Sequence, residues 1–257
     1  MKKTTKMLAI LLAAMTALSG CGGSGTTTTQ TEGKTETTAA AEKTGTETAQ
    51  KGPKDEVVTM AVISSWDTLN IYNTSGNYGN AVADQLFERL VTRTHDGVIE
   101  PRLATEWQIA DDNKSMTFKL AENALWHDGE KLTANDIVFT CKAMTNPDVD
   151  NYYRSAFNVL AGTDDDGIAA DTDQLGVEAV DDYTVKFSFK EPKDQDTILN
   201  AFLSFLYVLP EHVLDTGNYA DINNSSFWTS PVGAGPFKYV KDTAGETLEM
   251  EAFEDYY

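Results

Sequence analysis

Residues 104–139, ATEWQIADDNKSMTFKLAENALWHDGEKLTANDIVF, form the stretch that decides the fold. On both sides of the polar segment 111–114, apolar and polar side chains alternate, as in a hairpin with one buried face. In a second turn, 127–130, Gly129 is free to take a positive φ. Thr133 stands three residues before Asp136, which predicts the capped start of a helix. The alternating apolar residues of the hairpin are Trp107, Ile109, Met116, Phe118 and Leu120.

Hydrophobic periodicity predicts the remaining elements. The predicted strands are 57–63, 174–180, 183–189 and 237–240, and the middle two form a hairpin around Asp181 and Asp182. The predicted helices are 77–91, 151–160, 196–206 and one that begins after Pro210. Strand 57–63, the aromatic loop after it and helix 77–91 make a first βα unit. Its loop would lie at the carboxyl edge of a sheet, where open α/β folds bind ligands.

Several motifs in this order resemble the signature of the family 5 extracellular solute-binding proteins, which supply peptides, nickel and some sugars to ABC importers. They are AxEW at 104–107, TFxL at 117–120, WxDGxxLTAxDIVF at 126–139 and PVGAGPF at 231–237. In the last motif Ala234 replaces the usual Thr. The resemblance covers 57–257 and stops inside a further motif. It therefore implies an amino-terminal fragment that lacks the second ligand-gripping lobe and does not bind a ligand tightly by itself.

The resemblance implies an α/β fold of the type II periplasmic-binding-protein class. The first lobe would be discontinuous, 57–87 plus 196–257, with a peripheral α+β domain, 88–195, inserted between its two pieces. The implied function is capture of an extracellular solute, first of all a short peptide, and its delivery to an ABC permease, so the protein is not an enzyme. Nickel-chelate or oligosaccharide binding, an exported lipid-anchored hydrolase, and an adhesin or sensor with the same fold are the alternatives.

The amino-terminal residues predict export. Residues 1–20 combine three lysines with the apolar stretch 7–18, which is typical of a signal peptide and short for a membrane span. Leu18 to Cys21 (LSGC) resembles a bacterial lipobox, in which Cys21 is lipidated. Residues 22–56 contain almost no large apolar side chain and predict a disordered, Thr-rich tether. The protein is expected to be a monomer held at the outer face of the cytoplasmic membrane by this lipid alone.

The charge of the chain narrows its partners. The 257 residues carry a net charge of −20, and residues 57–257 account for about −21 of it, because the preceding segments nearly cancel. Such an acidic surface argues against nucleic acid as a partner. Acidity alone does not identify a cationic ligand, because most such charge is simply solvated.

A ligand held in an interlobe cleft needs a few placed polar groups and aromatic walls. Two segments offer that mixture, the loop 64–72 and the start of the predicted helix 151–160. The alternative for both is that the aromatic rings simply pack within the protein, and the same choice applies to Phe205 and Tyr207. The candidate ligand-binding residues are Ser64, Ser65, Trp66, Asn70, Tyr72, Tyr152 and Tyr153.

The sequence predicts no catalytic residue, no cofactor and no metal site. The three histidines are scattered, without a second His four residues away. The acidic loop 164–173 has the wrong register for a calcium loop, because Gly162 takes the first ligand position. With Cys21 lipidated, Cys141 has no disulfide partner, and its place on an apolar helix face predicts a buried thiol.

Overall fold

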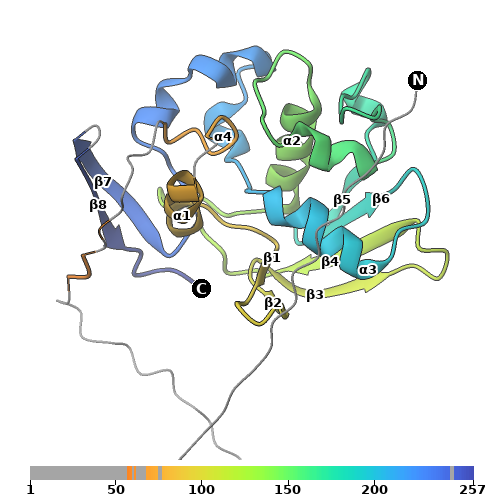
Figure 1. Ribbon diagram of the computed structural model, residues 1–257, viewed down its shortest axis with the longest axis horizontal. Helices are drawn as coiled ribbons and strands as arrows, with labels where there is room; N and C mark the ends of the chain where they lie inside the picture. Colours follow the sequence, from red (N-terminus) through yellow and green to blue (C-terminus); the bar gives the residue numbers. More distant parts are fainter. Residues whose placement is uncertain (1–56, 60, 62–67, 75–76, 244–245) are drawn as a thin grey trace, which may run out of the picture. The chain divides into compact units, whose positions relative to one another are not determined.

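A four-stranded antiparallel sheet organises residues 104–188. In the computed structural model its strands are β3 (Ala104–Ile109), β4 (Ser115–Leu120), β5 (Val177–Asp181) and β6 (Thr184–Ser188). Their order across the sheet is β3-β4-β6-β5 (Figure 1). The two predicted hairpins are therefore confirmed, and they lie side by side through pairing of β4 with β6.

The structure describes residues 57–59, 61, 68–74, 77–243 and 246–257. Residues 58–257 form one unit. The predicted signal peptide, Cys21 and the tether lie outside the described residues. No helix in the described part is long and apolar enough to cross a membrane.

The first hairpin has the register that its alternation predicts. Trp107 lies opposite Phe118, and Ile109 lies opposite Met116. Met116 and Phe118 are fully buried, whereas the two partners on the edge strand β3 are half-buried. Asn113 closes the turn with a φ of 56°, a left-handed conformation that Asn tolerates better than most residues.

Helix α2 (Ala134–Thr145) begins where the sequence predicts and packs on β5 and β6. The Asp136 carboxylate accepts a hydrogen bond from the Thr133 backbone N–H at 2.8 Å, which satisfies one of the free donors at the helix start. Ile137, Cys141 and Met144 are fully buried on its inner face. Burial raises the pKa of the free Cys141 thiol well above its ordinary value, so the predicted structural thiol is confirmed.

Helix α1 (Asn77–Leu86) is shorter than predicted, because residues 87–91 leave the helix. The Leu86 carbonyl accepts a hydrogen bond from Gly235 N–H, and the Glu88 carbonyl accepts one from Val208 N–H. Distant chain segments thus take the acceptors that a longer helix would use. The chain continues into a small hairpin of β1 (Val91–Arg93) and β2 (Ile99–Pro101).

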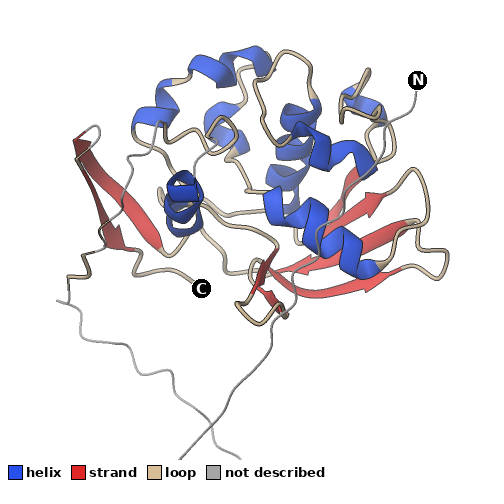
Figure 2. Cartoon of the chain, in the orientation of Figure 1, coloured by secondary structure: helices blue, strands red, loops and turns tan. Residues whose placement is uncertain are grey.

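The other helical segments are short and partly irregular (Figure 2). The predicted helix 151–160 is a 3-10 helix, η1 (Arg154–Val159). The predicted helix 196–206 passes from α3 (Gln195–Thr197) through a π-helical segment, η3 (Ile198–Phe202), to the 3-10 turn η4 (Leu203–Phe205). Pro210 precedes α4 (Glu211–Leu214), as predicted. Further 3-10 segments are η2 (Thr172–Gln174), η5 (Tyr219–Asn224) and η6 (Ser226–Thr229).

Aromatic rings join the sheet to the helical segments that cover it. The rings of Phe118 and Phe187 meet edge to face at 5.7 Å, Phe187 meets Phe202 at 5.4 Å, and Phe202 meets Phe157 at 5.5 Å. All four are fully buried. Edge-to-face packing at these distances adds to the stabilisation from apolar burial. One continuous core therefore links β4, β6, η3 and η1.

The glycine-rich segment 231–237 leads into β7 (Phe237–Thr243), which pairs with β8 (Thr247–Ala252). Strand β7 confirms the predicted strand at 237–240. The predicted strand at 57–63 is not formed at its described residues, Val57 to Thr59 and Ala61. Val57 and Val58 are 91% and 89% exposed, and a strand with neither a pairing partner nor a buried face is not stable in water. The described part is thus mixed α/β with antiparallel sheets, and the expected first βα unit is not seen in it.

Candidate functional site

The two segments that the sequence proposes as ligand-binding lie in contact. The backbone N–H of Tyr152 donates to the carbonyl of Tyr72 at 2.9 Å. The hydroxyl of Tyr153 donates to the carbonyl of Thr74 at 3.1 Å. Residues about 80 positions apart in the chain are therefore joined by hydrogen bonds.

A cleft of about 600 Å³ opens at this junction. The turn that contains Asn151 forms part of the cleft wall and is held in place by two hydrogen bonds. The Asn151 side chain accepts one from Tyr153 N–H at 2.8 Å and donates one to the Met144 carbonyl at 3.1 Å. Tyr152 projects from the turn with 66% of its surface exposed. Residues lining the cleft are Asn73, Pro147, Asp150, Asn151, Tyr152 and Arg154.

The other candidates in the loop point inward. Asn70 and Tyr72 are 5% and 1% exposed. The Asn70 side chain accepts a hydrogen bond from Tyr72 N–H at 3.1 Å, and the Tyr72 hydroxyl donates to the Tyr207 carbonyl at 2.6 Å. Burial raises the pKa of Tyr72 well above its ordinary value, so this hydroxyl stays protonated and keeps its hydrogen bond. Ser64, Ser65 and Trp66 lie outside the described residues.

Tyr153 connects the cleft to the core. Its ring stacks on Phe205 with centroids 5.0 Å apart, and its hydroxyl lies 3.3 Å from the side-chain oxygen of Asn80 in α1. Tyr153 is part-buried, whereas its neighbour Tyr152 is exposed. Of the two adjacent tyrosines, the first is therefore open to a ligand and the second supports it.

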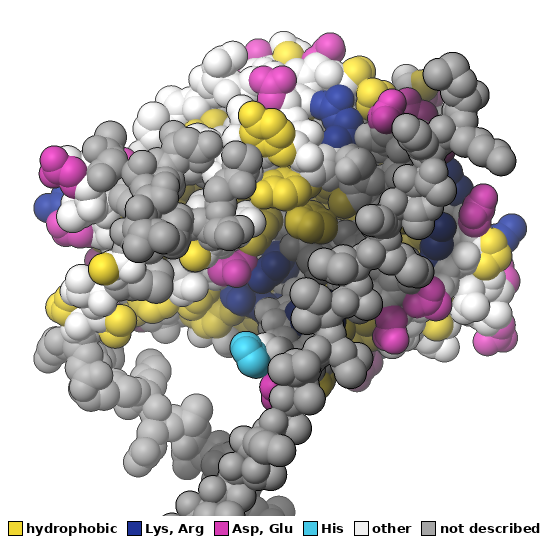
Figure 3. All heavy atoms as spheres, in the orientation of Figure 1, with side chains coloured by type: hydrophobic (Ala, Val, Ile, Leu, Met, Phe, Trp, Pro, Cys, Tyr) yellow, Lys and Arg dark blue, Asp and Glu magenta, His cyan; other side chains and the backbone are white. Residues whose placement is uncertain are grey.

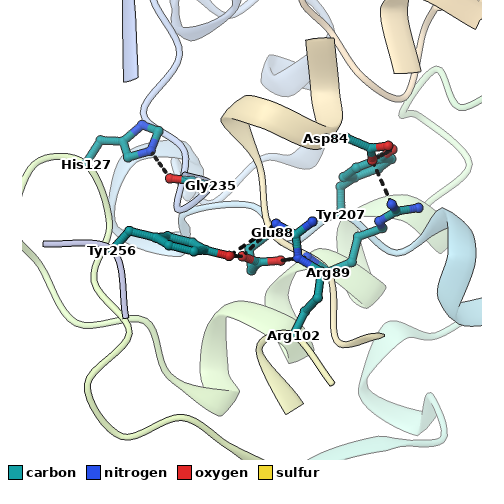
Figure 4. Close-up of polar contacts among 8 residues, drawn as sticks. All are labelled: Asp84, Glu88, Arg89, Arg102, His127, Tyr207, Gly235 and Tyr256. Carbon is teal, nitrogen blue, oxygen red and sulfur yellow. Dashed lines mark hydrogen bonds and ion pairs between the residues drawn. The ribbon is translucent and has the colours of Figure 1, made fainter. Parts of the chain in front are cut away.

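A polar cluster that the sequence analysis missed extends along the end of α1 (Figure 4). Arg89 forms an ion pair with Asp84 at 2.8 Å, and its guanidinium carbon lies 5.0 Å from the centre of the Tyr207 ring. The Tyr207 hydroxyl donates to the same Asp84 carboxylate at 2.7 Å. Burial is the main cause that raises the pKa of Tyr207. No spacing in the sequence relates Tyr207 to residues 84 and 89.

A buried ion pair in the segment after α1 holds Tyr256. Glu88 is fully buried and binds Arg102, with Nε 2.6 Å from Oε1. The Tyr256 hydroxyl donates to the other Glu88 oxygen at 2.8 Å (Figure 4). Burial opposes the charged form of Arg102, but the Glu88 carboxylate outweighs this effect, so the pKa of the guanidinium is raised. The Arg102 guanidinium thus stays charged, and its contact with Glu88 is structural.

His127 bonds to the glycine-rich segment. Its Nδ1 accepts a hydrogen bond from Gly233 N–H at 3.1 Å, and its Nε2 lies 3.0 Å from the Gly235 carbonyl. The neutral ring therefore carries its proton on Nε2. Burial lowers the pKa of His127. A histidine held in this way is a structural hydrogen-bonding group.

The described residues contain no group of three or more His, Cys, Asp or Glu side chains placed to hold a metal ion. In the acidic loop, Asp164 Oδ1 accepts hydrogen bonds from the backbone of Asp166 and Ile168, so it closes a turn. A second cleft, of about 680 Å³, lies at the end of the sheet and contains none of the candidate residues. Acidic side chains are scattered over the face in Figure 3.

The comparisons with known proteins define the class. The family described as bacterial extracellular solute-binding proteins, family 5 Middle, matches residues 98–257. This match covers more than half of the chain, so the chain belongs to that family, and the resemblance stated from the motifs is confirmed. Proteins of this family bind solutes and are not enzymes.

Two individual relatives show how far the sequence similarity extends. The chain is 33% identical over 175 residues to the periplasmic murein peptide-binding protein MppA of Escherichia coli, which is 65% of this chain and 30% of that protein. It is 25% identical over 260 residues to the oligopeptide-binding protein AppA of Bacillus subtilis, which is 100% of this chain and 42% of AppA. The chain thus spans less than half of the length of these relatives.

Solved structures give the same picture of the fold. The structure of AppA from Bacillus subtilis in complex with a nonapeptide matches with a TM-score of 0.65 and 26% identity, over 76% of this chain and 36% of that one. NikZ from Campylobacter jejuni in complex with Ni(L-His) matches with a TM-score of 0.62 and 27% identity, over 80% and 37%. The mixed α/β fold therefore corresponds to part of the fold of these binding proteins.

Proposed function

We propose that this protein captures a short peptide outside the cytoplasm and delivers it to an ABC permease. The observation that carries the proposal is the similarity to AppA, which extends over the whole chain in sequence and includes a structure with a bound nonapeptide. MppA, also a peptide-binding protein by name, supports the same ligand class. Binding by this fold would require closure over the ligand and no covalent step.

The proposal includes the arrangement expected from the sequence. The signal peptide 1–20 is removed, Cys21 carries the lipid, and residues 22–56 tether the folded part to the outer face of the membrane. Residues 57–87 and 196–257 belong to the first lobe, and 88–195 form the peripheral domain. The four-stranded sheet, which lies entirely within 104–188, is in keeping with this division.

The ligand would lie against the junction of the loop 64–72 with Tyr152 and Tyr153. The exposed Tyr152 ring and the adjoining cleft supply apolar surface and polar groups on a rigid base, which are the features that small-ligand sites combine. Asn70 and Tyr72 would contribute by bracing the loop from inside, since their side chains are buried.

One observation favours a second ligand, a nickel chelate, because the structure of NikZ with Ni(L-His) is among the matches. Calorimetry distinguishes the two ligands. The full-length protein is titrated with a mixed pool of peptides, from tripeptides to nonapeptides, and in parallel with Ni(L-His). Saturable heat with the peptides alone supports the proposal. Heat with the nickel chelate alone would favour nickel-chelate capture over peptide capture. No heat with either ligand would contradict both proposed functions.

A further inference from the structure

The wall of the cleft beside Tyr152 carries the carboxylate of Asp150, which has no charged partner among the described residues. Asp150 is exposed in the cleft wall, and its carboxylate forms no hydrogen bond or ion pair within the described part of the chain. Its backbone is held, because Asp150 N–H donates to the Asn223 side chain at 2.8 Å and that side chain donates to the Asp148 carbonyl at 2.7 Å. Asp150 thus presents a negative charge on an anchored turn.

The one other charged residue lining the cleft, Arg154, is bonded to the backbone. The Arg154 guanidinium donates through Nη2 to the carbonyl of Val149. It forms no ion pair with Asp150 among the described residues. Arg154 therefore stabilises the turn through the carbonyl group that precedes Asp150.

The neighbours of Asp150 suit a cation. The Tyr152 ring offers an exposed π-face, which attracts ammonium and guanidinium groups. The side chain of Asn73 lines the same cleft and makes no hydrogen bond within the described ranges, so its carbonyl oxygen is a further acceptor. The excess of acids across 57–257 adds a long-range field of the same sign.

We propose that this cleft selects a basic side chain of the bound peptide, lysine or arginine, through Asp150 and Tyr152. The inference rests on the proposed peptide-binding function and adds a preference to it. A partly exposed ion pair and one cation–π contact together predict a roughly threefold to thirtyfold tighter binding of a basic peptide than of its neutral match. Because the cleft is open to water, the preference should weaken as salt is raised.

The test is calorimetry on the complete encoded chain with alanine pentapeptides that carry one Lys, Gln or Glu at each position in turn. The expected result is a preference for Lys over Gln and for Gln over Glu at one position. In Asp150→Asn that preference for Lys over Gln should fall to less than about twofold. Tyr152→Leu should lower it partially. Asp148→Asn removes a neighbouring exposed acid outside the cleft and should leave it intact.

Three results would overturn the inference and leave peptide capture in place. The first is a Lys preference that survives in Asp150→Asn. The second is an equal loss in Asp148→Asn, which would assign the preference to the general acidic surface. The third is equal affinity for the peptides whatever their charge. If no peptide binds, the proposed function itself fails, and the preference fails with it.

Discussion

The contact between Gly233 and the end of α1 leads to a sharp prediction for Gly233→Ala. A Cβ atom on residue 233 would lie 1.7 Å from the Leu86 carbonyl oxygen and 2.7 Å from its carbon. Since these are backbone atoms, the clash cannot be relieved by rotating a side chain. Either the surrounding core is strained to accommodate the methyl group, which costs about 1–3 kcal/mol, or the segment 231–237 moves away from the end of α1.

Withdrawal would break three hydrogen bonds. They are Gly235 N–H to the Leu86 carbonyl, Gly233 N–H to His127 Nδ1, and His127 N–H to the Gly233 carbonyl. At about 1 kcal/mol each, their loss costs about 3 kcal/mol. Because the protein takes the less costly route, the predicted loss is about 1–3 kcal/mol. An ordinary domain is stabilised by only about 5–15 kcal/mol.

Urea unfolding followed by tryptophan fluorescence and far-ultraviolet circular dichroism measures the change. Gly217→Ala is a reference variant of a different kind, because Gly217 has a φ of +81° and no atom within 4 Å of its Cβ position. Its cost, about 1–2 kcal/mol, comes from left-handed backbone strain alone, and Gly233 does not have a left-handed φ. If Gly233→Ala costs less than about 1 kcal/mol, the close approach to α1 does not matter energetically and the reasoning is wrong.

Three further predictions concern buried polar groups. Glu88→Ala should cost about 3–5 kcal/mol in urea unfolding by leaving Arg102 buried without its partner, and Glu88→Leu combined with Arg102→Met should recover most of that loss; equal instability of both variants would contradict this. The pKa of His127 is lowered by burial, so the unfolded state takes up the proton first as pH falls. The free energy of unfolding should therefore decrease as pH is lowered below about 6.5. If the slope of this free energy against pH is unchanged in His127→Gln, another group is the cause. Cys141, a buried thiol with a raised pKa, should react with a thiol reagent at least about a hundredfold more slowly in the native protein than in urea; rapid native reaction would show that α2 opens.

The sequence predicts local structure well where neighbouring residues decide it. The register of the 104–120 hairpin follows from alternation, and the start of α2 follows from Thr133 and Asp136. The end of α1 could not be predicted, because it is imposed by Gly235, which lies far along the chain. The change from α to π to 3-10 helix within 195–205 could not be predicted either, because its apolar periodicity is compatible with all three kinds of turn.

For the candidate site too, the sequence indicates some residues and not others. An aromatic residue in a polar segment stands out, so Tyr72 and Tyr152 were predictable, and their contact was not. Asp150 and Asn73 carry no pattern that separates them from the other polar turn residues of an acidic chain. Their proposed role depends on the fold, which places the Asp150 carboxylate beside an exposed ring and gives it no partner among the residues that the structure describes.

The fastening of α1 by residues 233–256 also bears on the order of folding during synthesis. The Tyr256–Glu88 hydrogen bond joins residues 168 positions apart, and such distant contacts form late because a long loop must close first. The segment that follows α1 is therefore completed only after residue 256 has been made. For a protein exported behind a signal peptide, as proposed here, this delay would keep the chain unfolded while it crosses the membrane and let it fold on the far side.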